Sequence, residues 1–562
     1  MSRRFTRRTF VGGMLGGTLT AGCGQSYNAF SAMSYAQFST IKRAPVANAR
    51  QAPVADTCKS PSPADLVVDV HCHTFNARDL PIDGFVRSLA QGMGLPAVLD
   101  PVIAPLTRLF HEALVEVTKI EEEIEAAPES TSVDAASRLK SAHEKRDAAL
   151  AGLRNKIDEL VTFYKIFESA KDAGLLPEVR KDASNKVVPI LETMVLIANT
   201  RRKIANSIAN QYCQVELFTP ALVDFGYWIK RYKVGEVYDA DLSPAQQIEE
   251  HAKIITAAKK GELERKNVSF HPFVAFNPWR HVAENRGDGR TILKSVQEAV
   301  ESKGFIGVKL YPPSGFVPLG NAYLHDLKGE HGRNLDAALE ELYEWCTDKD
   351  VPILTHASMG NSFFKDSSWR ASPWGWRHAL EKHNDLRVCF GHFGHMQGID
   401  GKTAPVNCLA WAEGFLELMK TYPNVYGDVS NSLAGFKDRN VRETYQSQFL
   451  FWLCGRLSKD EKKVLAHRLL YGSDWWMGVI SGDDAGFFDQ IADMVKTSMG
   501  EYTKSAKEFP PDFWFRNSLR FLGIIGDDGK VRTNERSTGY RLREYYKDAT
   551  RPRWLEDTTV PA

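Results

Sequence analysis

Short hydrophobic runs that end in a polar side chain recur along the chain. Four of these runs end in histidine or aspartate, and they cover residues 66–73, 351–356, 387–392 and 468–474. Each run is apolar throughout and bounded by turn residues, as expected of buried parallel β-strands. The stretches between them have the apolar spacing of amphipathic helices. The alternation of strand and helix predicts an α/β fold.

Four further strands are expected at 214–218, 268–276, 305–310 and 424–428, which makes eight in all. Eight such strand–helix units would close into a TIM-like (β/α)8 barrel, in which catalytic side chains gather at the carboxyl ends of the strands. The polar residues that end the runs occupy those positions. His71 and His73 flank Cys72 on the first strand, so side-chain alternation turns both imidazoles to the same face.

Seven motifs follow one another along these elements. They read Val-Asp-Val-His-Cys-His-Thr at 68–74, Gly-Val-Lys-Leu-Tyr-Pro at 307–312, Pro-Ile-Leu-Thr-His at 352–356, Phe-Gly-His-Phe-Gly at 390–394, Asn-Val-Tyr-Gly-Asp at 424–428, Leu-Tyr-Gly-Ser-Asp-Trp at 470–475 and Asn-Ser-Leu-Arg-Phe-Leu-Gly at 517–523. Together they resemble the amidohydrolase superfamily, in the amidohydrolase-related branch that also contains metal-dependent decarboxylases. The resemblance spans about residues 65–525 in the family's order.

A metal site is expected from His71, His73, His356 and Asp474. This nitrogen-rich set with one carboxylate suits zinc, with manganese or iron as alternatives. No separate acidic bridging ligand is evident, so one ion is expected. By the resemblance, Asp474 both binds the metal and accepts a proton from water. His392 is the second expected catalytic residue, which polarises a substrate carbonyl or shuttles a proton.

Lys309 leaves three interpretations open. It can carry a carbamate that bridges two metals, as in some relatives, hold a substrate carboxylate, or pair with an acidic neighbour such as Asp428. With Lys309, Tyr311 and Trp475 are expected to contact the substrate, a small molecule.

Between residues 85 and 210 the chain departs from a plain barrel. Apolar residues at helical spacing, for example Leu153, Ile157 and Leu160, predict long helices, with a break at Pro128, Ser130 and Thr131. Because this helical insertion follows the first strand, it leaves the barrel on the face of the metal site. We expect a lid over the site, a homodimerisation arm or surface padding. The barrel would then comprise 65–84 and 211–545, followed by a C-terminal tail at 546–562.

The first 23 residues have the features of an export signal. Thr6–Val11 resembles a twin-arginine motif, and a mildly apolar stretch leads to Cys23, which is the expected lipidation site. Residues 24–64, rich in Ala, Ser, Gln and Pro, are expected to form a flexible linker. These features predict a protein on the periplasmic side that touches a membrane only through its N-terminal lipid anchor.

Composition narrows the function without naming a substrate. The 71 basic and 70 acidic residues give a formal charge of +1, so no electrostatic footprint of nucleic-acid binding is present. Three functions are considered. The first is a metal-dependent hydrolase that cleaves an amide, lactone or ester bond. The second is a decarboxylase of an aromatic or unsaturated carboxylic acid, and the third is a non-catalytic binding protein at the cell surface.

Overall fold

The computed structural model describes residues 66–84, 100–127, 133–172, 195–226, 240–284, 291–327, 330–358, 368–394, 406–430, 457–475, 491 and 512–556. The expected signal, the lipidation site Cys23 and the linker lie outside these residues. None of the described helices is long and apolar enough to cross a membrane.

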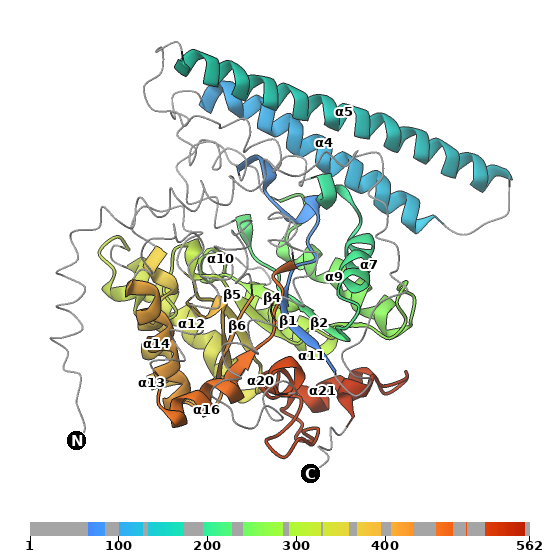
Figure 1. Cartoon of the computed structure of the whole chain (residues 1–562). Coiled ribbons are helices and arrows are strands. Elements are labelled where there is room, and N and C mark those ends of the chain that lie inside the picture. Colours follow the sequence, from blue (N-terminus) through green and yellow to red (C-terminus); the bar gives the residue numbers. More distant parts are fainter. Residues whose placement is uncertain are drawn as a thin grey trace.

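Short parallel strands form the centre of the molecule (Figure 1). The strands are β1 Val68–Cys72, β2 Leu217–Pro220, β3 Ser269–Phe270, β4 Phe273–Phe276, β5 Gly307–Leu310, β6 Ile353–His356, β7 Val388–Gly391, β8 Val425–Asp428 and β9 Leu469–Leu470. One sheet has the order β1-β2-β3 and the other β4-β5-β6-β7-β8-β9. Every pair within them is parallel, which confirms the predicted α/β class.

Backbone contacts connect the two sheets on both sides. A parallel bridge joins Ala221, just after β2, to Phe273 at the start of β4. On the other side the Val70 N–H donates to the carbonyl of Tyr471 across 3.2 Å. The β1 strand therefore lies beside the segment that follows β9, which places the first and last predicted strands next to each other.

Helices alternate with the strands as predicted. The α-helices are α4 Asp100–Ala126, α5 Val133–Asp172, α7 Arg201–Gln211, α9 Pro244–Lys259, α10 Pro278–Glu284, α11 Ile292–Ser302, α12 Glu330–Asp348, α13 Pro373–Lys382, α14 Val406–Thr421, α16 Lys459–Arg468, α20 Asn517–Phe521 and α21 Thr538–Tyr545. Several begin at a side-chain cap that satisfies free backbone N–H groups. Ser243 and Gln246 form a capping box at α9, and Ser458 and Glu461 do the same at α16.

Short single-turn elements connect these strands and helices. The 3-10 turns are η2 Ala77–Asp79, η4 Val195–Ala198, η5 Pro312–Ser314, η6 Asn321–Tyr323, η7 Ser368–Ala371, η8 His392–Gly394 and η10 Arg553–Leu555, and η9 Asp512–Arg516 is a π-helical turn. Two of them lie close to predicted site residues: η2 begins four residues after His73, and η8 contains His392. Local backbone geometry at these turns therefore decides where those residues point.

The hydrophobic core has two parts. The larger cluster lies between the strands and the surrounding helices, and the smaller one lies at the end where the strands begin. In the smaller cluster α20, α21 and η10 cover that end, with the buried Trp554 donating its indole N–H to Ser269 Oγ across 3.1 Å. The C-terminal segment thus closes the end of the strands opposite to the predicted metal residues (Figure 1).

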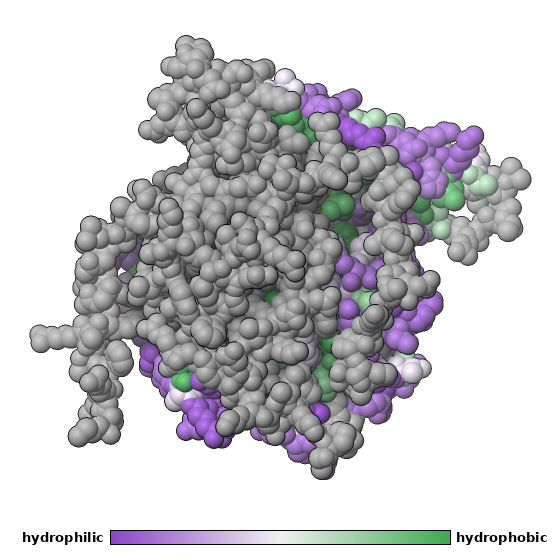
Figure 2. All heavy atoms as spheres, in the orientation of Figure 1, coloured by the Kyte–Doolittle hydropathy of each residue, from purple (hydrophilic) through white to green (hydrophobic). Residues whose placement is uncertain are grey.

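Helices α4 and α5 lie side by side as a long arm along one edge of the molecule (Figure 1). The predicted apolar positions Leu153, Ile157 and Leu160 of α5 are buried. On α4, Phe110 and Leu114 are buried as well. In Figure 2 hydrophilic residues dominate the visible face of this arm, with hydrophobic patches between them. Both helices are therefore amphipathic and share an apolar seam.

A buried ion-pair network connects the arm to the loop that follows β1. Two nitrogens of the Arg201 guanidinium, on α7, donate hydrogen bonds to the Asp79 carboxylate at 2.5 and 3.0 Å. Glu122 of α4 accepts hydrogen bonds from Arg201 and from Asn76, both at 3.1 Å, and pairs with Arg78. Because Asn76 and Asp79 lie a few residues after His73, this network fixes the path of the chain beside the predicted metal residues.

Loss of the guanidinium from this network should be costly. In Arg201→Met the Asp79 carboxylate, 2% exposed, loses the guanidinium and, among the contacts of the described residues, retains only the weaker hydrogen bond from the backbone N–H of Asn76. Removing one member of a buried ion pair costs about 3–5 kcal/mol. We expect a lower midpoint in chemical denaturation, corresponding to a loss in this range.

The matched control is Lys253→Met, which breaks an exposed pair with Glu250 on α9. Such surface pairs contribute at most about 1 kcal/mol. Equal midpoints for the two variants would show that the Arg201 network does not stabilise the fold.

Candidate metal centre

The candidate residues come from six strands that end at the same edge. His71 lies near the end of β1, His356 ends β6 and Asp428 ends β8, while His392 directly follows β7. Lys309 is the third residue of β5, and Asp474 lies four residues beyond β9. Parallel strands place their carboxyl ends together. The fold therefore gathers these side chains into one buried site.

Two imidazoles and a carboxylate form the core of the site. His71, His73 and Asp474 each offer a ligand atom, and the three atoms lie within 4.8 Å of one another. The shortest approach is 3.2 Å, between His73 Nε2 and Asp474 Oδ1. His73 and Asp474 are 12% and 4% exposed. The structure thus brings together three of the four predicted ligands.

The hydrogen bonds of His73 show what this group requires. Its Nδ1 lies 2.7 Å from the carbonyl of Ala221. A carbonyl only accepts, so Nδ1 carries a proton and donates it. The other nitrogen, Nε2, therefore points at the Asp474 carboxylate. The Nε2 lone pair and the carboxylate oxygen repel each other unless a positive charge lies between them. That charge can be a proton or a metal ion.

His71 is held from both sides of its ring. Nδ1 lies 3.1 Å from Asp428 Oδ2 and 2.8 Å from Ser430 Oγ, and Nε2 lies 2.9 Å from Lys309 Nζ. An ammonium only donates, so Nε2 accepts and the ring proton resides on Nδ1, where it faces Asp428. A carboxylate behind an imidazole in this way fixes the tautomer that can bind a metal through Nε2.

A second group shares His71. Its ligand atoms come from His71, His392 and Asp428, again within 4.8 Å of one another. The backbone N–H of His392 donates to Asp428 Oδ1 across 3.0 Å, and the ring nitrogen His392 Nδ1 lies 3.0 Å from the carbonyl oxygen of Ser430. The His71 and His392 rings are 4.8 Å apart between centroids. His392 therefore adjoins the site, as expected for a residue that acts beside a metal.

His356 lies on the far side of His392. Their ring centroids are 4.8 Å apart, and His356 Nε2 is 3.1 Å from Ser358 Oγ. Neither of the two ligand groups includes His356. The role of His356 as a fourth ligand remains a prediction.

Backbone geometry at two of these residues is unusual. His392 has φ of 65° and Asp474 has φ of 49°, in the left-handed region that non-glycine residues rarely occupy. The Asp474 N–H is held by the carbonyl of His71 across 2.6 Å. Such conformations cost about 1–3 kcal/mol each and concentrate at functional sites.

Two glycines make room for the His71 ring. A Cβ on Gly391 would lie 2.9 Å from His71 Cε1 and 2.9 Å from the carbonyl oxygen of Thr355. A Cβ on Gly472 would lie 2.9 Å from His71 Cβ. The Phe-Gly-His and Tyr-Gly-Ser-Asp motifs therefore contain glycine because the histidine on β1 occupies the space of a side chain.

Burial sets the charge of each group. It lowers the pKa of His71 to about 3, with the Lys309 charge adding to the effect, and it lowers the pKa of His356 well below the usual value. Both imidazoles are therefore neutral. Burial also lowers the pKa of Lys309 to about 8, against the opposing charges of Asp428 and Asp474. The site thus contains neutral histidines beside ionisable groups of both signs.

The two carboxylates stay ionised although burial opposes it. Desolvation alone would raise the pKa of Asp428, but His71, His392 and Ser430 outweigh it and hold this pKa below its usual range. The same balance applies to Asp474, where His73 contributes most to keeping the pKa low. Among the described residues of the site, these two carboxylates lie near the Lys309 side chain, and a further cation would offset their remaining negative charge.

Tyr311 and Trp475 have different surroundings. The Tyr311 ring is half-buried, 5.0 Å from that of His356. The indole N–H of Trp475 donates to Gln211 Oε1 of α7 across 2.7 Å, within the larger core cluster. Tyr311 is thus close to the site, while Trp475 connects it to α7. Substrate contact by either residue remains a prediction.

Several residues of the site were not anticipated. Ser430 bridges His71 and His392, and Asp69 accepts from the backbone N–H of His71 and from both donors of Ser473. Burial raises the pKa of Asp69 to about 7, with Ser473 opposing the shift. Ser430 follows β8 by two residues, so its position at the shared edge was a usable signal. No periodic pattern indicates Asp69, because the register of β1 shifts between Asp69 and Cys72.

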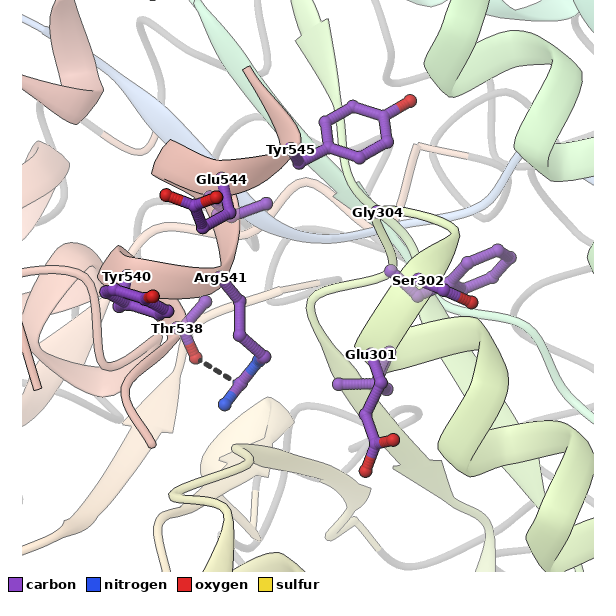
Figure 3. Close-up of a pocket in the computed structure, with 11 residues that line it drawn as sticks. Glu301, Ser302, Gly304, Thr538, Tyr540, Arg541, Glu544 and Tyr545 are labelled. Atoms are coloured by element: carbon purple, nitrogen blue, oxygen red, sulfur yellow. Dashed lines mark hydrogen bonds between the residues drawn. The ribbon is translucent and has the colours of Figure 1, made fainter. Parts of the chain in front are cut away.

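A separate cavity of about 290 Å³ lies between α21 and the turn from α11 to β5. Figure 3 shows Thr538, Tyr540, Arg541 and Glu544 on the α21 side of this cavity and Glu301 on the other side. The Arg541 guanidinium is bonded to Thr538 Oγ1 at 2.9 Å. None of its lining residues belongs to the metal group, and it lies before the start of β5, so it is not part of this site.

Comparison with known proteins finds a family match for part of the chain. Residues 277–508 match the family model described as Amidohydrolase. The match confirms the resemblance drawn from the motifs. It includes His356, His392 and Asp474, whereas His71 and His73 precede it and are brought to the same place by β1. No curated protein matches the chain.

Three solved structures are similar in part. An amidohydrolase from Burkholderia multivorans with bound zinc has a TM-score of 0.35 and 13% identity, over 59% of this chain and 91% of that one. A putative metal-dependent hydrolase from Lactobacillus casei has a TM-score of 0.34 and 11% identity, over 82% and 95%. A putative 2-pyrone-4,6-dicarboxylic acid hydrolase from Pseudomonas putida has a TM-score of 0.29 and 15% identity, over 55% and 96%. With TM-scores this low, none of them supports an argument about the site.

The packing of His71 can be tested through Gly391. In Gly391→Ala the added methyl group meets the backbone oxygen of Thr355, which cannot move without distorting β6. Overpacking of this kind costs about 1–3 kcal/mol, and we expect that loss in chemical denaturation.

Gly152→Ala is the control, because a Cβ at this position in α5 meets nothing within 4 Å. Replacing a mid-helix glycine should stabilise by about 0.5–1 kcal/mol. If Gly391→Ala were as stable as the wild type, the close approach of the His71 ring would be wrong.

Proposed function

We propose that the protein is a metal-dependent hydrolase that activates water to cleave an amide, lactone or ester bond. The observation that carries this proposal is the convergence of His71, His73 and Asp474 at one buried point. The family match over 277–508 supports it independently. As its scaffold we propose a closed (β/α)8 barrel, since backbone contacts join the two sheets on both sides.

The residues fit a divalent cation. The 3.2 Å approach of His73 Nε2 to Asp474 Oδ1 is one that a metal ion or a proton between them satisfies, and His71 has its Nδ1 proton directed to Asp428. We propose that these three residues hold the ion, with His356 as the fourth ligand. Two or three imidazoles with one carboxylate favour zinc. When bound, such an ion lowers the pKa of a water molecule towards neutrality and polarises the oxygen of the substrate.

The remaining steps fall to side chains. Asp474 is ionised and has two oxygens, of which one faces His73, so the other can accept a proton from the attacking water. His392, fixed by Asp428 and Ser430, presents its ring beside His71 and His356 and can polarise the substrate carbonyl. Asp428 keeps the His71 ring in one orientation.

One observation favours the alternative function, decarboxylation of an aromatic or unsaturated acid. Aromatic rings form a half-buried series beside His73 and His356. Phe75 lies 5.4 Å from His73, Phe225 lies 5.8 Å from Phe75, and Tyr311 lies 6.3 Å from Phe225, between ring centroids. Such rings pack well against a flat, unsaturated substrate. In that reaction Asp474 or His392 would donate a proton to carbon.

Asp474→Asn tests the mechanism. Asparagine keeps the size and one oxygen donor but cannot accept a proton. Turnover per bound metal should therefore fall by at least ~100-fold, the low end for loss of a general acid–base group. Metal content is measured on the same samples by elemental analysis, where we expect about one ion per wild-type chain.

His392→Asn is the comparison, since His392 is proposed to polarise the substrate rather than to bind metal, so metal content should stay close to that of the wild type. A panel of amides, lactones and aryl carboxylates, followed by water incorporation and by CO₂ release, separates the two reactions. A metal-replete Asp474→Asn protein with near-normal turnover would refute the mechanism in either case.

We further propose export by the twin-arginine route and lipidation at Cys23, on the basis of the N-terminal sequence. The disulfide at Cys213 supports an oxidising compartment. Replacement of both Arg7 and Arg8 with lysine should leave the precursor in the cytoplasm, which cell fractionation measures. Cys23→Ser should be exported without acylation. Lipid labelling that persists in Cys23→Ser would disprove the anchor.

A further inference from the structure

We infer that Lys309 is a built-in competitor for the metal, whose ammonium occupies the coordinating nitrogen of His71 and lowers the affinity of the site for divalent cations. This inference rests on the proposed metal centre and concerns how the site is loaded. It differs from the carbamate and substrate-binding interpretations of Lys309 drawn from the sequence, because the lysine is neither a metal ligand nor a contact of the substrate.

The first step is the contact itself. Lys309 is 2% exposed, and its Nζ lies 2.9 Å from His71 Nε2. The opposite ring nitrogen faces Asp428, as described above. His71 therefore has one free electron pair, on Nε2, and the ammonium accepts it as a hydrogen-bond partner. A metal needs the same electron pair, and one pair cannot serve both.

The second step is charge. Among the described residues, the Lys309 side chain lies 2.9 Å from His71, whose other ring nitrogen lies 3.1 Å from the Asp428 carboxylate. In the metal-free site the Lys309 ammonium therefore offsets part of the negative charge of the carboxylates. A divalent ion that binds there has less negative charge left to neutralise. Once the ion binds, the ammonium becomes a like charge at close range in a buried site, which is unfavourable.

The third step is the surroundings of Lys309, which limit where the ammonium can go. It lies on β5 between β4 and β6, with Lys309 paired to Ala275 on one side and Leu354 on the other. Metal loading must therefore move or neutralise a side chain that the strand holds close to His71.

The experiment measures Zn²⁺ affinity of the metal-stripped full-length protein by competition with a chromogenic chelator, so that no activity is required. Lys309→Met removes the charge and keeps the length of the side chain. We expect Zn²⁺ to bind at least about tenfold more tightly than to the wild type, within the range by which neighbours of metal ligands alter affinity. Lys303→Met is the control, because Lys303 pairs with Glu249 just before the same strand and should leave affinity unchanged.

Folding of each metal-free variant is checked by circular dichroism. Should Lys309→Met not fold without metal, Lys309→Gln is measured in the same way, and the same increase in affinity is expected. Equal or weaker binding by the neutral variant overturns the inference. Weaker binding, together with tighter binding of Zn²⁺ by the wild type in bicarbonate, would identify Lys309 as a carbamate ligand. If the wild type and all variants fail to bind Zn²⁺, the proposed metal centre fails as well.

Discussion

The orientation of the His71 ring is the constraint on which the site depends. Asp428 holds one nitrogen, Lys309 contacts the other, and Gly391 and Gly472 leave the space that the ring fills. Each of these residues comes from a different strand or strand end. A shift of any one of these strands would move a contact of His71. The position of this imidazole therefore depends on how all of these parallel strands pack.

Charge explains why this arrangement favours a cation. Asp428 and Asp474 remain ionised in a buried site, and among the described residues the Lys309 ammonium offsets one of these two charges. His73 points its free nitrogen at Asp474, a geometry that needs a positive centre between them. Burial of unbalanced charge is costly, and a divalent ion relieves that cost. The strained backbone at Asp474 and His392 is held by hydrogen bonds to His71 and Asp428, so strain and charge are concentrated at the same place.

The sequence predicted the parts of this account that follow from periodicity. His71, His356, His392 and Asp474 lie at or beyond the ends of strands that the hydrophobic runs predict, because a buried parallel strand is a continuous apolar segment. The helices α4 and α5 likewise follow apolar spacing, with α4 ending at Ala126 and α5 beginning at Val133 on either side of the predicted break.

The sequence could not predict contacts that depend on strand register. The Asp69 carboxylate accepts hydrogen bonds from the backbone N–H and the hydroxyl of Ser473, and side-chain alternation alone gives no sign of this contact. The proximity of Lys309 to His71 depends on how far β5 is shifted along the strand direction relative to β1. Neither sequence motif gives that shift. His356 is not part of the group formed by His71, His73 and Asp474, and this too follows from the positions of the strands in space, which the sequence does not give.

The most direct test of the metal centre is a crystal structure of the wild-type protein with anomalous diffraction data collected at the absorption edge of its bound metal. The account predicts one peak within about 2.0–2.2 Å of His71 Nε2, His73 Nε2 and an oxygen of Asp474, with Lys309 Nζ displaced from His71. A metal bound elsewhere, with Lys309 still 2.9 Å from His71 Nε2, would contradict it.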